Sequence, residues 1–329
     1  MTTGTGLSAQ VGIAEELTYG TYVEPDTFFE FISESMVPAN PAINSEALGS
    51  GVFRSRAPRH HVTGASGDLT LDVVNLGWEL FIKHALGALA TSQPDDVAEP
   101  NHYKHSGTPG SLRGKSLTLQ VGRPSTDATI QPFSYLGGKI TAWSIAAELD
   151  AIATLTATMD FKTEDTSETL ATASYPADMR SFTFLDGSLS MDGDTVGVVN
   201  SIELNGTNPM NTNRRGLGGE KLEPLVNARR LVTGTFTSEF EDMLAHQAWI
   251  AGAEQANLLL TFALAGTEID TGEENPFKLV IDIPRLYYTG DAPQVGGPDI
   301  VSQNKPFEAY KPSGGEIITI DLHNDDSAA

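Results

Sequence analysis

The sequence predicts a mainly β protein made of two tandem copies of one domain. Each copy is predicted as a pair of packed antiparallel sheets with one flanking helix and a long loop between strands. The first observation is a strict alternation of polar and apolar residues, clearest over residues 68–73, which is typical of a half-buried strand. The second observation is that short motifs recur in the same order about 168 positions apart, which indicates a duplicated domain.

Four features carry the internal repeat. Given as first copy and then second, they are Asn40-Pro41 and Asn208-Pro209, Leu48-Gly49 and Leu217-Gly218, Val62-Thr63-Gly64 and Val232-Thr233-Gly234, and the glycines Gly87 and Gly252 that end two apolar helical segments. We therefore predict an N-terminal arm over residues 1–25, a first copy over residues 26–174 and a second copy over residues 175–329. The boundary lies near Tyr175-Pro176.

The composition sets the broad class of the protein. The 329 residues carry a net charge of −23, are 40% hydrophobic and contain no cysteine. A globular chain without disulfides or thiolate metal sites follows. So strong a negative charge disfavours stable nucleic-acid binding, because binding requires positive charge against the phosphates. The longest apolar run, near residues 80–89, is too short and too polar for a bilayer, so no membrane contact is expected. The N-terminus lacks the pattern of a secretory signal.

Both copies are predicted to have the same order of elements. Strands are expected over residues 28–36, 68–73, 116–121, 138–146 and 151–161 in the first copy, and over residues 182–204, 236–241, 258–265, 277–283 and 316–322 in the second. Asp192-Gly193 predicts a hairpin turn. Asn75 is the expected N-cap of the first helix, and Trp78 and Trp249 are expected to anchor the two helices in the core. Residues 90–113 and 287–315 are predicted as insertion loops.

No motif in the chain predicts catalysis, a cofactor or a metal site. The stretch Gly110–Ser116 resembles a phosphate-binding loop, but Pro109 stands where the motif needs glycine and a strand follows instead of a helix. His102 and His105 share a loop with several acids, which we interpret as a solvated loop and not as a weak cation site. We therefore expect a protein that is not an enzyme.

Two glycine-rich loops hold a large share of the basic residues. These loops, residues 49–61 and 216–230, occupy matching places in the two copies. We predict that they contact acidic surfaces of neighbouring subunits, where complementary charge fixes the register. The candidate residues, in these loops or directly before the second one, are Arg54, Arg56, Arg59, Arg214, Arg215, Arg229 and Arg230.

Three stretches, one in the predicted N-terminal arm and two in the first copy, are similar to the major tail tube proteins of long, non-contractile-tailed bacteriophages. They are Gly12-Ile-Ala-Glu-Glu-Leu-Thr-Tyr-Gly-Thr21, Val62-Thr-Gly-Ala-Ser-Gly-Asp-Leu-Thr-Leu-Asp-Val73, and Gly114-Lys-Ser-Leu-Thr-Leu-Gln-Val-Gly-Arg-Pro124 with Pro132-Phe-Ser-Tyr135. The second copy is connected to this family mainly through the internal repeat. Many tube proteins carry one domain per chain, whereas this chain is predicted to carry two.

The resemblance implies a structural virion protein. Its rings would stack into a tube, with three two-domain chains in a pseudo-sixfold ring, and genome DNA would pass through without stable binding. It also implies the tape measure, tail terminator and distal tail proteins as partners, a place in the virion tail, and the host cytoplasm before assembly. We expect the ring-to-ring contacts at the two basic loops. The lumen candidates are acids expected on wet strand faces: Glu30, Glu34, Asp68, Asp72, Glu203, Glu239 and Glu241.

Other functions remain open at this point. A glycan-binding β-sandwich adhesin or decoration module would use exposed aromatic platforms, for which Tyr103, Tyr287, Tyr288 and Tyr310 are available. A secretion-system tube protein of the same fold is poorly separated from a phage tube by the sequence pattern. A hydrolase with an acid pair is the weakest alternative, since no pair stands out among 43 acidic residues.

Overall fold

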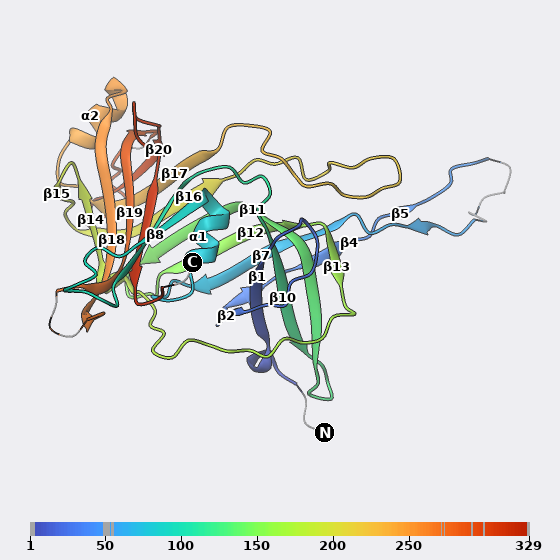
Figure 1. The fold of residues 1–329 in the computed structure, drawn as a ribbon. Helices are drawn as coiled ribbons and strands as arrows, with labels where there is room; N and C mark the ends of the chain where they lie inside the picture. The colour runs from blue at the N-terminus through green and yellow to red at the C-terminus, as the bar shows by residue number, and fades with distance from the viewer. Residues whose placement is uncertain are drawn as a thin grey trace.

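The computed structural model describes residues 4–48, 53, 56–270, 272, 274–290, 292–298 and 300–327. It confirms a mainly β fold of antiparallel strands with two short α-helices in these residues (Figure 1). Among the residues described, no helix has the length and apolarity that crossing a membrane requires.

The first half contains thirteen strands and one α-helix within the described residues. They are β1 (Gln10–Glu16), β2 (Thr27–Phe29), β3 (Ser33–Glu34), β4 (Val37–Ala39), β5 (Ala42–Ile43), β6 (Arg59–His60), β7 (Gly64–Asp72), α1 (Glu79–Leu86), β8 (Gly87–Ser92), β9 (Tyr103–Pro109), β10 (Ser116–Pro124), β11 (Ile130–Glu148), β12 (Thr154–Phe161) and β13 (Thr163–Asp165).

The second half contains the remaining elements. They are β14 (Gly187–Met191), β15 (Asp194–Thr195), β16 (Val199–Thr207), β17 (Leu231–Glu239), α2 (Leu244–Ala251), β18 (Gln255–Glu268), β19 (Pro276–Tyr288), β20 (Ser302–Ala309) and β21 (Thr319–Asn324). The predicted hairpin turn lies between β14 and β15, where Asp192 (φ 51°) and Gly193 (φ 87°) both adopt positive φ.

Strand β11 belongs to two sheets of the first half. Its N-terminal part pairs with β10 and β13, and its C-terminal part pairs with β12. The change of direction coincides with Gly137, at φ +70°, and with register shifts on both sides of the strand. One sheet thus runs β2–β1–β10–β11–β13, and the other runs β7–β12–β11 with β3 and β4 on the edge of β7.

Residues 10–16 lie inside the first of these sheets and not in an N-terminal arm. As β1 they pair with β10 over seven positions and with β2 on the other side. The side chains of Val11 and Ile13 are fully buried. The predicted arm is therefore wrong for this segment, because its alternating apolar residues complete the core of the sandwich.

The strand pairings of the second half follow a comparable order. β17 pairs with β16 and β20, as β7 pairs with β4 and β12, and β18 pairs with β14 and β19, as β10 pairs with β1 and β11. β21 pairs with the N-terminal part of β19, as β13 pairs with that of β11. β20 therefore occupies the place of β12, although we predicted an insertion loop over residues 287–315 and assigned that place to residues 316–322.

The pairing register also corrects one motif of the repeat. Thr207 pairs with Leu231, and Ala39 pairs with Gly64, so the nine-residue strands β17 and β7 correspond from their first residues. The sequence match of Val62-Thr63-Gly64 to Val232-Thr233-Gly234 is three positions out of this register. Short motifs in β-strands are easily matched out of register because many side chains fit the same alternation.

The two halves are joined edge to edge. β11 pairs with β16 over seven positions, from Ala142↔Thr207 to Glu148↔Ser201. The result is one long sheet that runs β4–β7–β12–β11–β16–β17–β20 through both halves. On a second layer, the hairpin β8–β9 of the first half adds to β21 of the second half.

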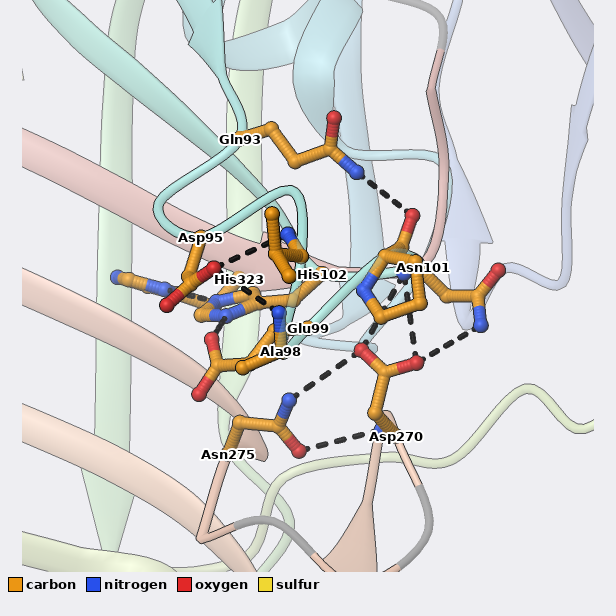
Figure 2. Close-up of polar contacts among 11 residues, drawn as sticks. Gln93, Asp95, Ala98, Glu99, Asn101, His102, Asp270, Asn275 and His323 are labelled. Carbon is orange, nitrogen blue, oxygen red and sulfur yellow. Dashed lines mark hydrogen bonds and ion pairs between the residues drawn. The ribbon is translucent and has the colours of Figure 1, made fainter.

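A polar cluster fixes the tip of that hairpin to the second half (Figure 2). The carboxylate of Asp270 accepts hydrogen bonds from the backbone and side-chain nitrogens of Asn101, and Asn275 bonds to Asp270. The rings of His102 and His323 share a hydrogen bond of 2.8 Å between Nε2 and Nδ1. His102 also contacts the Glu99 carboxylate and is 5% exposed, so the predicted solvated loop is wrong here.

Candidate functional site

One face of the long sheet is mainly polar, with Ala142, Ala146, Leu231 and Pro306 among the polar residues. Along β7, the exposed or half-exposed residues Asp68, Thr70 and Asp72 alternate with the buried residues Leu69 and Leu71. The same alternation continues through the other strands of the sheet. The remaining polar-face members in β12, β11, β16, β17 and β20 are Thr154, Thr156, Thr158, Ser144, Ser201, Asn205, Thr233, Thr235, Thr237, Ser302 and Asn304.

Four of the predicted lumen acids lie on this polar face. Asp68 accepts a hydrogen bond of 2.7 Å from Thr158, and Asp72 stands opposite Thr154. Glu203 lies between Ala146 and Thr235, and Glu239 ends β17. The alternation of each strand places them on the same side, so the structure brings acids from both halves onto one surface.

Two further acids on the polar face were missed by the sequence prediction. Glu148 stands opposite Ser201 beyond the predicted end of its strand, and Glu308 stands opposite Thr233 in β20, which we had predicted as a loop. In both cases the alternation of the neighbouring residues could have found them. Within the described strands, this face carries one lysine, Lys139, and no arginine.

Lys139 lies at the rim of the polar face, where its charge is neutralised by an ion pair with Glu223. A second ion pair, between Asp160 and Lys221, lies beside it. The Lys139 ammonium lies 2.6 Å from the Glu223 carboxylate, and the neighbouring Asp160 is held at 2.7 Å by Lys221. Burial lowers the pKa of Lys139 and raises that of Asp160. Glu223 and Lys221 come from the loop between β16 and β17, so this loop docks on the first half through buried charges.

The other three lumen candidates do not lie on the polar face. Glu34 is paired with Leu69, which puts it on the core side of the sheet, and Arg123 binds both of its carboxylate oxygens. Glu30 follows β2 and lines an open groove with Glu34 and Arg123. Glu241 lies beyond the end of β17, outside the strand. For Glu30 and Glu34, the prediction failed because it assumed one regular strand over residues 28–36, whereas two short strands, β2 and β3, form there.

The basic loops do not behave alike. Arg230 is half-buried and donates hydrogen bonds to the carbonyl oxygens of Ala85, Leu86 and Gly110 in its own chain. It therefore binds the end of α1, and the prediction that it reaches another ring is wrong. Burial lowers its pKa.

Of the other predicted arginines in the described residues, Arg215 is half-buried and the rest lie at the surface. Arg214 donates to the Glu223 carbonyl oxygen and Arg215 to the Asn213 side chain, while Arg56, Arg59 and Arg229 are exposed. Arg54 lies outside the described residues. The described segment around β5 and the loop between β16 and β17 extend from the same side of the molecule (Figure 1).

The remaining candidate sites show no arrangement for chemistry. In the part of the chain that is described, no group of three or more histidines and acids is placed to hold a metal ion. Of the tyrosines considered for glycan binding, Tyr287 and Tyr310 contact each other edge to face, with centroids 5.1 Å apart. Tyr288 is half-buried, and this burial raises its pKa to about 12.

A comparison with protein-family models finds a match that spans most of the chain. The model described as phage tail tube protein matches residues 6–309, which is nearly the whole chain. The chain belongs to the phage tail tube protein family. The comparison with curated proteins gives no match.

Family membership indicates that this chain is a structural protein of the phage tail. Tail tube proteins form a component of the virion tail and assemble with themselves into a tube.

Proposed function

We propose that this tail tube protein forms stacked rings of three chains, and that the polar face of the long sheet lines the lumen through which DNA passes. The pairing of β11 with β16 carries the proposal, since it already joins two sheet units within one chain. The similar pairing order of the two halves supports a domain duplication. Three chains would then supply six sheet units to a closed barrel, which removes the free edges.

The charge of the polar face supports a role in DNA passage. Its acids are Asp68, Asp72, Glu148, Glu203, Glu239 and Glu308, together with the paired Asp160. A negatively charged wall repels phosphates, and hydroxyl side chains between the acids bind water in place of DNA. DNA would therefore move along the wall without stable binding.

Ring-to-ring contact is the role proposed for the first long loop. Residues 40–63 leave the long sheet after β4, and the described part includes the exposed pair β5–β6 with Arg59. The matching loop of the second half is anchored on its own chain through Lys221 and Arg230. Deleting residues 216–230 should thus unfold the junction between halves, whereas shortening the first loop should spare the fold and stop stacking.

Electron microscopy of the concentrated purified protein tests the assembly. Stacked rings with threefold chain symmetry are expected, and a ring built from another number of chains would contradict the proposal.

Nuclease protection tests the assignment of the lumen. Tubes with Asp68, Asp72, Glu203 and Glu239 replaced by lysine should retain duplex DNA in a nuclease-resistant form. A control with the same charge change off the face, at Glu30, Asp96, Asp194 and Glu241, should leave bound DNA open to nuclease. Equal protection in the two sets would show that the polar face is not the lumen.

A further inference from the structure

Asn208 closes the junction between the two halves of the chain. Its side-chain nitrogen donates to the carbonyl oxygens of Ala85 (2.9 Å) and Ile140 (3.0 Å), and its side-chain oxygen accepts from Arg230 at 2.6 Å. The residue is 1% exposed. Ala85 lies in the last turn of α1, where helix carbonyls lack partners within the helix. One asparagine of the second half thus caps a helix and binds a strand of the first half.

Asn40 holds the corresponding position in the first half. Asn208 follows Thr207, the residue paired with the start of β17, and Asn40 follows Ala39, the residue paired with the start of β7. Asn40 is exposed, however, and its side chain makes no hydrogen bond within the described part of the chain. The edge on which it lies is also open, because β4 pairs with β7 alone whereas β16 pairs with both β17 and β11.

The C-terminal end of α2 lacks the kind of cap that Asn208 gives to α1. Ile250 is the penultimate residue of α2, as Ala85 is of α1. Among described residues, no donor reaches the carbonyl oxygens of Ile250 and Ala251. The exposed side of α2 is largely apolar: Met243, Leu244 and Ile250 are exposed by 47%, 68% and 68%, with the polar Gln247 among them. An exposed apolar helix face of this kind marks a contact surface.

We propose that Asn40 of one copy caps α2 of a neighbouring copy. The first half of the copy that supplies Asn40 then covers the exposed side of this α2. This contact rests on the proposed ring and identifies what closes it. The occupant is a second copy because the matching helix, α1, takes its polar end contacts from the other half of its chain. Asn208 and Arg230 bind its last carbonyl oxygens, and Asn324 donates to Glu79 at its start. Within one chain, β4 and α2 lie at opposite ends of the molecule (Figure 1), so a chain cannot form both halves of the contact with itself.

Replacing Asn40 by aspartate tests the cap with minimal change of shape. Aspartate cannot donate a hydrogen bond, and its charge opposes the negative end of a helix dipole. We expect the critical concentration for assembly to rise by about tenfold or more, while the thermal unfolding of the isolated chain stays unchanged. Light scattering and circular dichroism measure the two quantities.

Asn208→Asp is the matched control, because it removes the same donor from the contact within the chain. It should lower the melting temperature of the isolated chain. Two results would overturn the cap: Asn40→Asp assembles like the wild type, or Asn40→Asp destabilises the isolated chain as much as Asn208→Asp does. Neither result would contradict the proposed tube. A wild-type chain that never self-associates would overturn both.

Cross-linking provides an independent test, since the chain contains no cysteine. Mixed single variants Asn40→Cys and Ile250→Cys should give covalent dimers on oxidation, because a disulfide requires Cα atoms within roughly 7 Å. A mixture of Asn40→Cys with Leu185→Cys, which is 80% exposed in the second half, should give none. Equal dimer yields in both mixtures, or no dimer in the first, would overturn the contact.

Discussion

Helices α1 and α2 share a local pattern but differ in what surrounds them. Each has eight residues, follows a nine-residue strand and ends at a glycine in the left-handed region, Gly87 or Gly252. Six residues of α1 are buried, whereas no residue of α2 is. Trp78 is 2% exposed at the start of α1, but Trp249 is only partly buried, so the prediction of two matching core anchors is wrong for Trp249.

The difference follows from the elements that come after each helix. The hairpin β8–β9 is inserted between α1 and β10, and its second strand joins β21 of the second half. After α2, strand β18 begins at Gln255 with no such insertion. Equivalent helices therefore reach different burial, because burial depends on what the rest of the chain places against them. In an assembling protein, the helix left uncovered is the one available to a partner.

The two tryptophans give the largest expected contrast. Trp78→Ala should destabilise the isolated chain by about 3–5 kcal/mol, because it opens a cavity in the core. Trp249→Ala should cost less than about 1 kcal/mol in the same state, since its surroundings are partly solvent. Urea unfolding followed by fluorescence measures both. Similar losses for the two variants would show that α2 is packed as firmly as α1.

Acidification should weaken the junction between β21 and the hairpin β8–β9. Burial is the main cause that lowers the pKa of His323 to about 3, with Lys278, Lys104 and the rings of His102 and His105 adding to the effect. Since the folded pKa lies below the unfolded value of 6.5, the unfolded chain takes up the proton first. The stability from this group is present above pH 6.5 and is lost as the pH falls toward 3.

Between pH 7 and 5 the loss should be on the order of 2 kcal/mol. Urea unfolding at several pH values measures it, and His323→Gln should show a shallower slope over that range. A slope identical to that of the wild type would mean that His323 is not held neutral at the junction.

The smallest contrast concerns two adjacent arginines. Arg230→Ala leaves the carbonyl oxygens of Ala85 and Leu86 without the guanidinium at the end of α1, at a cost of about 1–3 kcal/mol. Arg229 is exposed, so Arg229→Ala should change stability by less than about 0.5 kcal/mol. Thermal unfolding of the two variants compares them directly. If Arg229→Ala were the more harmful change, the assignment of the cap would be wrong.

Much of the β architecture could be predicted from local pattern. The alternation around Leu69 and Leu71, the turn at Asp192-Gly193 and the glycines that end both helices all form as expected. Asn75 is not the N-cap of α1, which begins at Glu79 after Trp78. Its side chain instead accepts a hydrogen bond from the backbone of Arg180 in the second half, a contact between distant segments that no local rule contains.

The candidate site was only partly predictable for the same reason. Asp68 and Glu239 sit in regular strands, where period-two alternation assigns the face. Glu34 follows a break between two short strands, which changes its side relative to the expectation. Arg230 was predicted as a surface contact because its sequence neighbours are polar, yet it folds back onto a helix end.

The sequence by itself determined that the chain is an acidic, cysteine-free, mainly β protein with short motifs that recur about 168 positions apart, because hydrophobic periodicity, charge and recurring motifs are properties of the order of residues. Only the tertiary structure decided which strands pair, which acids share a face, and which helix is covered. Those outcomes depend on registers and contacts between residues far apart in the chain, and a shift of a single position moves a side chain from the core to the polar face.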